Sequence, residues 1–170
     1  MLTKEIAAAL NQQINNEFQA AYLYLSMSCY CEEKSFSGMA HWLRMQAQEE
    51  VSHGMKIYTY LNDMEQSVTM QTIPQPKIKF EGLQDIFESA LESEKKVASD
   101  LNQIATLALE KSDQMTYSFL KWFLDEQVEE ISSVGTILDK VKLIGDQGYG
   151  LLMLDNELGS RPAGEAGTAE

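Results

Sequence analysis

The chain has 170 residues, of which 44% are apolar and 23% charged, and it contains only 3 prolines, as is typical of one soluble domain that can form long helices. Acidic residues outnumber Lys and Arg by 26 to 13, so the formal net charge is -13. Because proteins that bind nucleic acids or anionic membranes concentrate Lys and Arg instead, we expect no nucleic-acid partner and no membrane, and cations as the natural ligands.

The N-terminal sequence, MLTKEIAAALNQQINNEF, already has helical spacing and lacks the pattern of a signal peptide. No run approaches the ~18 apolar residues of a membrane span. We therefore expect a cytoplasmic protein. Cys29 and Cys31 are two positions apart on a predicted helix and point to different sides, so we expect two reduced packing thiols in preference to a redox or metal pair.

Apolar residues recur every three or four positions along four long segments, which predicts four helices. Thr3 and Asp113 are suitable N-caps for the first and fourth helices, Ser35 or Ser37 for the second, and Gly145 is a suitable end for the fourth. The predicted helices cover residues 4–33, 37–64, 83–111 and 113–144.

The connections between these helices predict their directions. Short breaks, KSFSG and KSDQ, join the first helix to the second and the third to the fourth, so each pair should be antiparallel. The break at 65–82 can span roughly 59 Å when extended, whereas the second helix is only about 42 Å long. The sequence therefore predicts an all-α four-helix bundle with one long crossover loop between the second and third helices.

After the fourth helix, the segment DQGYGLLMLDNELG predicts a short fifth helix at the C-terminal end. Its apolar residues need a partner to pack against: Leu151, Leu152, Leu154 and Leu158. The end of the chain, GSRPAGEAGTAE, is small and polar. We therefore expect a single domain at 1–158 and a mobile tail at 159–170.

Charged residues also lie on the apolar faces of the predicted helices. Residues seven apart share nearly the same face of a helix, so an acidic residue on the core face should have an apolar residue seven positions away on both sides. Glu49, Glu88 and Asp125 fail this test. Four glutamates pass it, one on each long helix: Glu17, Glu50, Glu94 and Glu130.

Counting from the hairpin turns places these glutamates near one level, together with His53 and Gln127. A single glutamate on a core face often reaches solvent, takes up a proton or meets buried water. Four together would repel one another, and no Lys or Arg occupies the matching positions, so the compensating charge must come from protons or metal ions. Oxygen ligands with one imidazole suit iron or manganese, and four carboxylates call for two ions.

At this point the sequence resembles the non-haem bacterial ferritins. The resemblance runs from INNEFQAAYLYLSMS through EEVSHGMKIYTYL and ESALESEKKV to WFLDEQVEEISS. It implies a ferritin-like di-iron domain. By resemblance, Glu17, Glu50 and His53 hold one iron. Glu50, Glu94 and Glu130 hold the second, so that Glu50 bridges.

The resemblance also assigns residues around this pair. Gln127 would tune the site by hydrogen bonding, and Tyr24 matches a redox-active tyrosine, with core packing as the alternative. Trp122 matches a tryptophan of the family, where packing is an equal alternative. His41 matches no motif and is interpreted as structural. A third iron site would comprise three acidic residues that otherwise form a solvated patch: Glu49, Glu126 and Glu129.

Departures from related families narrow the subclass. Haem-containing bacterioferritins carry a second Glu-x-x-His, where this chain has Gln127 and Glu130, and a haem-binding methionine where it has Val51. We therefore expect no haem. Tyr117 and Leu120 stand where animal ferritins have channel acids, which leaves the route of iron into the protein unassigned.

The implied function is ferroxidase activity with iron storage. Ferritins oxidise Fe(II) with O2 or H2O2 and store ferric oxide mineral in a homo-oligomeric cage of 24 subunits, in which the fifth helix would pack against its symmetry mates. Two alternatives remain open at this point. One is a di-iron peroxidase or oxygenase of smaller oligomeric size, and the other is a helical scaffold that binds cations without catalysis.

Overall fold

The structure, a computed structural model, describes residues 2–162 and contains five helices in that part of the chain. Their boundaries agree with the predicted helices to within one residue for the first four, because the three-four spacing of apolar residues is sustained along each segment. The helices are α1 (Lys4–Glu33), α2 (Ser37–Asp63), α3 (Leu83–Glu110), α4 (Gln114–Ile144) and α5 (Gly148–Gly159).

Most of the predicted helix ends are confirmed. The Thr3 hydroxyl accepts a hydrogen bond from the Ile6 amide at 3.3 Å. The fourth helix is capped in the same way by Asp113, and it ends at Gly145, whose φ of 57° is the left-handed conformation that glycine adopts readily. The predicted serine cap of α2 is wrong. Phe36 occupies that position without a side-chain cap, because the preceding Ser35 is used in a left-handed turn with φ of 63°.

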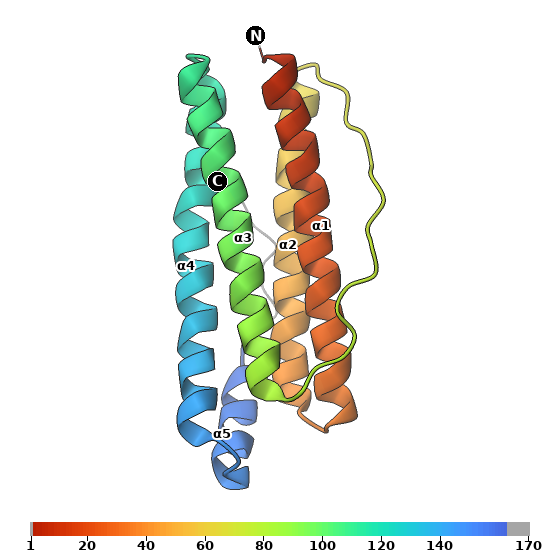
Figure 1. The fold of residues 1–170 in the computed structure, drawn as a ribbon, viewed down its shortest axis with the longest axis vertical. Helices are drawn as coiled ribbons and strands as arrows, with labels where there is room; N and C mark the ends of the chain where they lie inside the picture. The colour runs from red at the N-terminus through yellow and green to blue at the C-terminus, as the bar shows by residue number, and fades with distance from the viewer. Residues whose placement is uncertain (1, 163–170) are drawn as a thin grey trace.

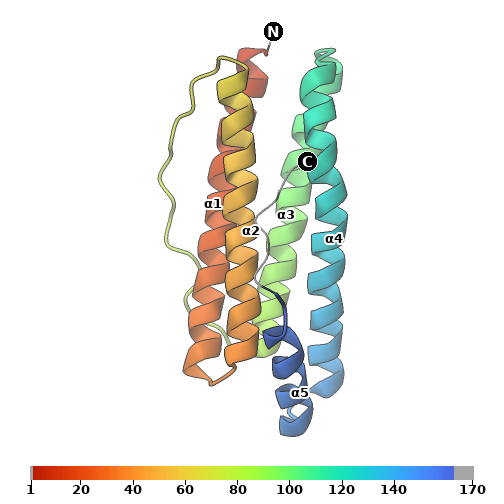
Figure 2. The same cartoon turned by 180° about the vertical axis from the view of Figure 1, so that it is seen from behind.

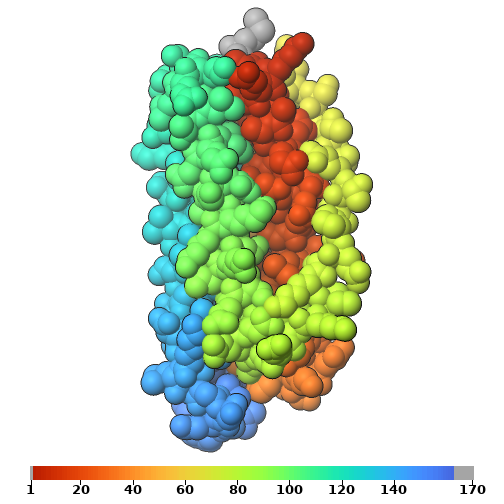
Figure 3. Space-filling view, in the orientation of Figure 1, coloured from red at the N-terminus to blue at the C-terminus, as the bar shows by residue number. Residues whose placement is uncertain are grey.

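The predicted bundle topology is confirmed. Figure 1 shows α1 antiparallel to α2 and α3 antiparallel to α4, while α2 and α3 run in the same direction. The crossover between Asp63 and Leu83 lies along the outside of α1 (Figure 3). It is held there near both of its ends, because Asn11 accepts from the Thr69 amide at 2.7 Å and Ser26 donates to the Lys77 carbonyl at 2.6 Å.

The interior has apolar residues at both ends and a polar layer between them. Leu43 and Phe87 belong to the apolar cluster near the α5 end, and Ile6 and Leu101 belong to the cluster near the N-terminal end. Both clusters contain residues from all four long helices. The bundle is thus held at its two ends by ordinary burial of apolar surface, which leaves the middle available for polar groups.

The fifth helix packs on the start of α2, at one end of the bundle (Figure 2). Leu154 and Leu158 are buried there, and Asp155 accepts a hydrogen bond from the Met39 amide at 2.8 Å. The close approach of the α5 backbone to α2 requires glycine at position 38, since a Cβ on Gly38 would lie 1.8 Å from the Asp155 carbonyl oxygen. Two of the four leucines that were expected to need a packing partner, Leu154 and Leu158, are therefore buried within this chain.

The segment predicted as a mobile tail begins inside this element. Gly159 is the last residue of α5, and Arg161 contacts the bundle through its side chain and its carbonyl oxygen. The rest of the predicted tail, 163–170, lies outside the described residues.

The two cysteines differ in their surroundings. Both are free thiols, but Cys31 is buried and Cys29 is exposed. Burial raises the pKa of the Cys31 thiol to about 12. The prediction of packing thiols is therefore confirmed for Cys31 and wrong for Cys29, because positions two apart on one helix cannot both face the core.

Candidate metal centre

Each of the four long helices contributes one glutamate to the polar layer. Their positions within otherwise apolar stripes carry these side chains into the interior, as the seven-residue test predicts. The exposed fractions are 0% for Glu17, 1% for Glu50, 1% for Glu94 and 8% for Glu130.

Glu17, Glu50 and His53 form the first close group. One ligand atom from each lies within 4.8 Å of the other two, and the His53 Nδ1 atom is 3.4 Å from Glu50 Oε2. In the described structure Glu17 Oε2 and both carboxylate oxygens of Glu50 are buried without a hydrogen-bond partner. Orphaned buried oxygens of this kind are costly, and a cation among them would remove that cost. The donor set fits iron.

Glu94 is held by two neighbouring side chains. The Tyr24 phenol donates to Glu94 Oε1 at 2.5 Å, and the Gln127 amide donates to Glu94 Oε2 at 2.6 Å. The phenol of Tyr24 is fully buried and its ring meets the Trp42 ring edge-on at 6.5 Å. Tyr24 and Gln127 therefore both fix the orientation of one carboxylate. Glu94 joins no group of three ligand atoms within 4.8 Å among residues 2–162.

Glu130 belongs to a second close group with His53 and Glu126, again within 4.8 Å of one another. The Gln46 amide, on α2 in the other helix hairpin, donates to Glu130 Oε2 at 2.6 Å. His53 is thus shared between the two groups. Its ring also lies edge-on to the rings of Trp122 at 5.5 Å and Phe123 at 6.1 Å, which restrict its orientation.

Burial dominates the electrostatics of this layer. It raises the pKa of Glu17 and of Glu50 well above the usual range, and neighbouring carboxylates raise both further. Burial also raises the pKa of Glu94, and it raises the pKa of Glu130 to about 7. Without a bound cation the layer therefore retains protons near neutral pH. Cations that bind there must displace those protons.

The three acidic residues predicted to form a third site do not form a group of ligand atoms within 4.8 Å of one another among the described residues. Glu126 lies in the group with His53 and Glu130, but neither Glu49 nor Glu129 belongs to any such group in the described part of the chain. Glu129 is exposed. Both oxygens of Glu49 accept hydrogen bonds from the Arg161 side chain, each at 2.8 Å.

The two remaining residues singled out from the sequence have evident structural contacts. His41 Nε2 lies 2.8 Å from the Arg161 carbonyl oxygen, in agreement with the structural role predicted for it. Trp122 lies between His53 and the Lys56 ammonium, which is 4.0 Å from the centre of its ring. Trp122 therefore links the candidate ligand His53 to the surface of the bundle.

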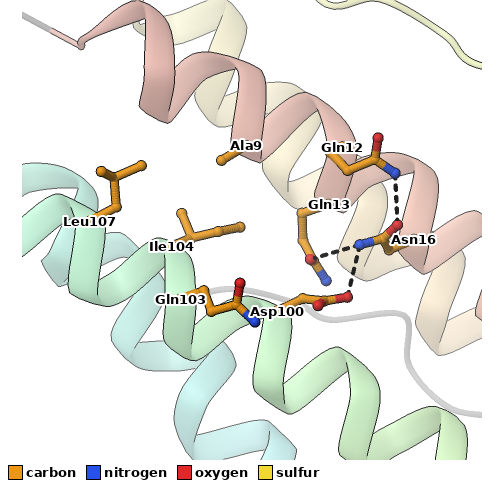
Figure 4. A pocket seen from close by; sticks show the side chains of 8 residues that line it. All are labelled: Ala9, Gln12, Gln13, Asn16, Asp100, Gln103, Ile104 and Leu107. Carbon is orange, nitrogen blue, oxygen red and sulfur yellow. Dashed lines mark hydrogen bonds between the residues drawn. The ribbon is translucent and has the colours of Figure 1, made fainter.

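A groove between α1 and α3 is lined by both polar and apolar side chains, among them Gln13, Asn16 and Asp100 (Figure 4). It has a volume of about 350 Å³. Within it, Asn16 donates to Asp100 at 3.1 Å and to the Gln13 oxygen at 3.4 Å. Gln13 in turn donates to Glu17 Oε1 at 2.8 Å. A continuous chain of hydrogen bonds therefore connects the groove to one buried carboxylate.

Three residues that orient this layer were missed in the sequence. Gln13 has Ile6 and Ala20 seven positions away, so the test used for acidic residues would have identified it had it been applied to amides. Gln46 lies on the core stripe but has His53 seven positions later and so fails the test, and Arg161 reaches the layer only through tertiary contacts.

An all-α bundle with one long crossover and a buried layer of carboxylates and histidine defines the ferritin-like class. Residues 7–144 match the family described as Ferritin-like domain. The chain is 41% identical to the bacterial non-heme ferritin of Staphylococcus epidermidis over 165 residues, 97% of this chain and 99% of that relative. It is 40% identical to that of Staphylococcus saprophyticus over 166 residues, 98% and 99% of the two chains. The chain belongs to the ferritin family.

Solved structures agree with this assignment. An open pore ferritin from the hyperthermophilic archaeon Archaeoglobus fulgidus superposes with a TM-score of 0.94 and 35% identity, covering 95% of this chain and 99% of the other. A humanized archaeal ferritin superposes with a TM-score of 0.94 and 37% identity, covering 95% and 98%. The resemblance to non-haem bacterial ferritins is thereby confirmed. Within residues 2–162, no helix is both long and apolar enough to cross a membrane.

Proposed function

We propose that this protein is a cytoplasmic iron-storage ferritin that oxidises Fe(II) with O2 or H2O2 and stores the product as ferric oxide mineral inside a homo-oligomeric cage of 24 subunits. The observation that carries the proposal is the buried layer of four glutamates and His53, in which three carboxylate oxygens of the described structure have no hydrogen-bond partner.

Two Fe(II) substrate ions balance the charge of this layer. Glu17, Glu50 and His53 are the proposed ligands of one ion. Glu50, Glu94 and Glu130 are the proposed ligands of the other, so that Glu50 is shared. The four carboxylates lose their protons as two divalent cations bind, and the net charge of the layer is then zero.

The proposed oxidation uses both ions together. Each Fe(II) gives one electron to the same O2, which takes up two protons and becomes H2O2, and two Fe(III) result. Carboxylates are hard, negatively charged ligands that stabilise Fe(III) more than Fe(II) and so favour this direction. The protein contributes the positions of the ligands, which Gln13, Gln46 and Gln127 orient by donating to Glu17, Glu130 and Glu94 respectively.

Tyr24 has two proposed roles in the same reaction. Its phenol orients Glu94, and it is close enough to the layer to supply a further electron to an oxidant. Burial and the Glu94 charge raise the pKa of the Tyr24 phenol well above its usual range, so the phenol keeps its proton.

A third iron is proposed at Glu49, Glu126 and Glu129, as a step between the paired site and the mineral. No haem is part of the proposal.

Assembly into a cage is supported by exposed apolar side chains, which a monomer rarely leaves uncovered in groups. One group surrounds a pocket at α1 and the crossover, and the other lies on and beside α5. The residues are Tyr22, Leu25 and Ile78 in the first group, and Leu143, Tyr149, Leu152 and Met153 in the second.

The proposed function is tested by stopped-flow oxidation of two Fe(II) per subunit with simultaneous recording of oxygen uptake. We expect a fast phase in the wild type and its loss in Glu50→Ala and in His53→Ala. Glu92→Ala is a matched control, since Glu92 is exposed on α3 only two residues from Glu94. Equal fast phases in all four proteins would overturn the proposal.

A further inference from the structure

Arg161 lies two residues after the end of α5, and its side chain and its carbonyl oxygen both contact α2. Its guanidinium donates to both oxygens of Glu49, at 2.8 Å each, and also to the Gln46 side-chain oxygen. The guanidinium carbon lies 5.2 Å from the centre of the Trp42 ring. The Arg161 carbonyl meets His41. Four residues of α2 therefore hold this one arginine.

These contacts connect Arg161 to the candidate metal layer. Gln46 accepts from Arg161 and donates through its amide nitrogen to Glu130 Oε2 at 2.6 Å. One hydrogen-bonded chain thus runs from the end of the described structure to a proposed iron ligand. The guanidinium and the layer therefore share Gln46 as a neighbour.

The positive charge of the Arg161 guanidinium lies directly against the Glu49 carboxylate. The side chains of Arg161 and Glu49 are only 24% and 31% exposed. One guanidinium nitrogen, Nη2, lies 2.8 Å from both Glu49 oxygens, while Nη1 donates to Gln46, so the guanidinium holds both side chains at once. A metal ion at Glu49 would have to break at least one of these hydrogen bonds. It would also be repelled by the adjacent positive charge.

We propose that Arg161 is a positioning residue that closes the third metal site by pairing with Glu49, so that a divalent cation binds there only when the segment after α5 releases. The inference rests on the third site of the proposed function. It explains why Glu126 and Glu129 are not joined by Glu49 in the described structure: the native guanidinium supplies the positive charge in place of the cation. Release of Arg161 also removes its hydrogen bond to Gln46, the residue that donates to Glu130, and this change links the third site to the paired site.

The test uses the assembled full-length protein and Zn(II), which binds without oxidation, in calorimetric titrations. In the wild type we expect two tight ions per subunit and a third, weaker one. In Arg161→Ala we expect the affinity for the third ion to rise about tenfold, the effect of losing a charged pairing of this exposure, while the affinity for the first two changes less than twofold. Arg161→Lys keeps the charge but has only one nitrogen, which cannot hold Glu49 and Gln46 as the two guanidinium nitrogens do, and it should lie in between.

Two controls separate this role from simple anchoring of α5. Lys140→Ala removes another α5 contact, the pair between Lys140 and Glu157 at 2.5 Å, without touching Glu49, and should leave all three affinities unchanged. Adding Glu49→Gln to Arg161→Ala should abolish the third ion.

The inference is overturned if Arg161→Ala leaves the affinity for the third ion unchanged or lowers it, if Lys140→Ala raises that affinity equally, or if no variant binds a third ion. If two ions still bind tightly in any of these outcomes, the proposed paired site is not contradicted. Loss of the two tight ions in the wild type would instead contradict the proposed function.

Discussion

The Tyr24 phenol and the Glu94 carboxylate are joined by a hydrogen bond of 2.5 Å between α1 and α3. This contact links an aromatic side chain of the core to a proposed iron ligand on the other helix hairpin. Tyr24 is fully buried, so the same residue serves packing and orientation together.

Tyr24→Phe separates these two contributions, because it retains the ring and removes only the hydroxyl. We expect the metal-free protein to lose about 1–2 kcal/mol of unfolding free energy, as Glu94 is left with one side-chain donor, Gln127. Guanidinium unfolding measures this loss. Two Zn(II) should still bind per subunit, and Fe(II) oxidation should be slower. An unchanged oxidation rate would mean that Tyr24 serves packing alone.

We expect the Glu50 side chain to lower the unfolding free energy of the metal-free protein, although it is needed to bind metal. Its two oxygens are buried without hydrogen bonds in the described structure, so Glu50→Met, of similar volume, should stabilise the metal-free protein by about 1–3 kcal/mol. The same variant should lose both iron ions. Guanidinium unfolding and metal titration check the two expectations separately. A destabilised variant would show that the charge at Glu50 already has a partner.

The stability of the metal-free protein should fall as pH rises. Burial raises the folded-state pKa of Glu130 to about 7 from its ordinary 4.5, so the stabilisation from its neutral form is complete below pH 4.5 and is lost as pH rises through 7. The loss should be about 2–3 kcal/mol between pH 5 and 8. Glu130→Gln should show a smaller loss across this interval in guanidinium unfolding. An identical pH dependence in the wild type and in Glu130→Gln would contradict the raised pKa of Glu130.

Gly38→Ala should detach α5 from the bundle. The added Cβ would meet the Asp155 backbone at 1.8 Å, which a rotation of a side chain cannot relieve. We expect faster proteolysis within α5 and fewer assembled cages in size-exclusion chromatography. Gly135→Ala is the matched control, because a Cβ there meets nothing within 4 Å and alanine is the better helix former by roughly 1 kcal/mol. Intact α5 in Gly38→Ala would show that the backbones can separate without cost.

The sequence predicts the bundle and the glutamate layer well because both depend on periodicity. Glu17, Glu50, Glu94 and Glu130 interrupt apolar stripes, and helical geometry alone carries such residues inward. The crossover follows from loop length in the same way. These properties are local to each helix or to one connection, so no tertiary contact had to be known.

The parts that could not be predicted depend on contacts between distant segments. Arg161 lies in a small, polar segment whose composition predicts mobility, and its partners are set by the way α5 folds back on α2. Gln46 has His53 seven positions later and so does not stand out from its stripe. The serine cap of α2 failed for a local reason, since the left-handed turn at Ser35 determines which residue occupies the cap position.

The paired iron site is tested most directly by a crystal soaked with Fe(II) without oxygen and examined by anomalous scattering at the iron edge. We expect two iron peaks between the four long helices. Glu17 and His53 should contact one peak, Glu94 and Glu130 the other, and Glu50 both. A single peak, or iron bound only outside this layer, would contradict the central claim that the buried glutamates form a paired iron site.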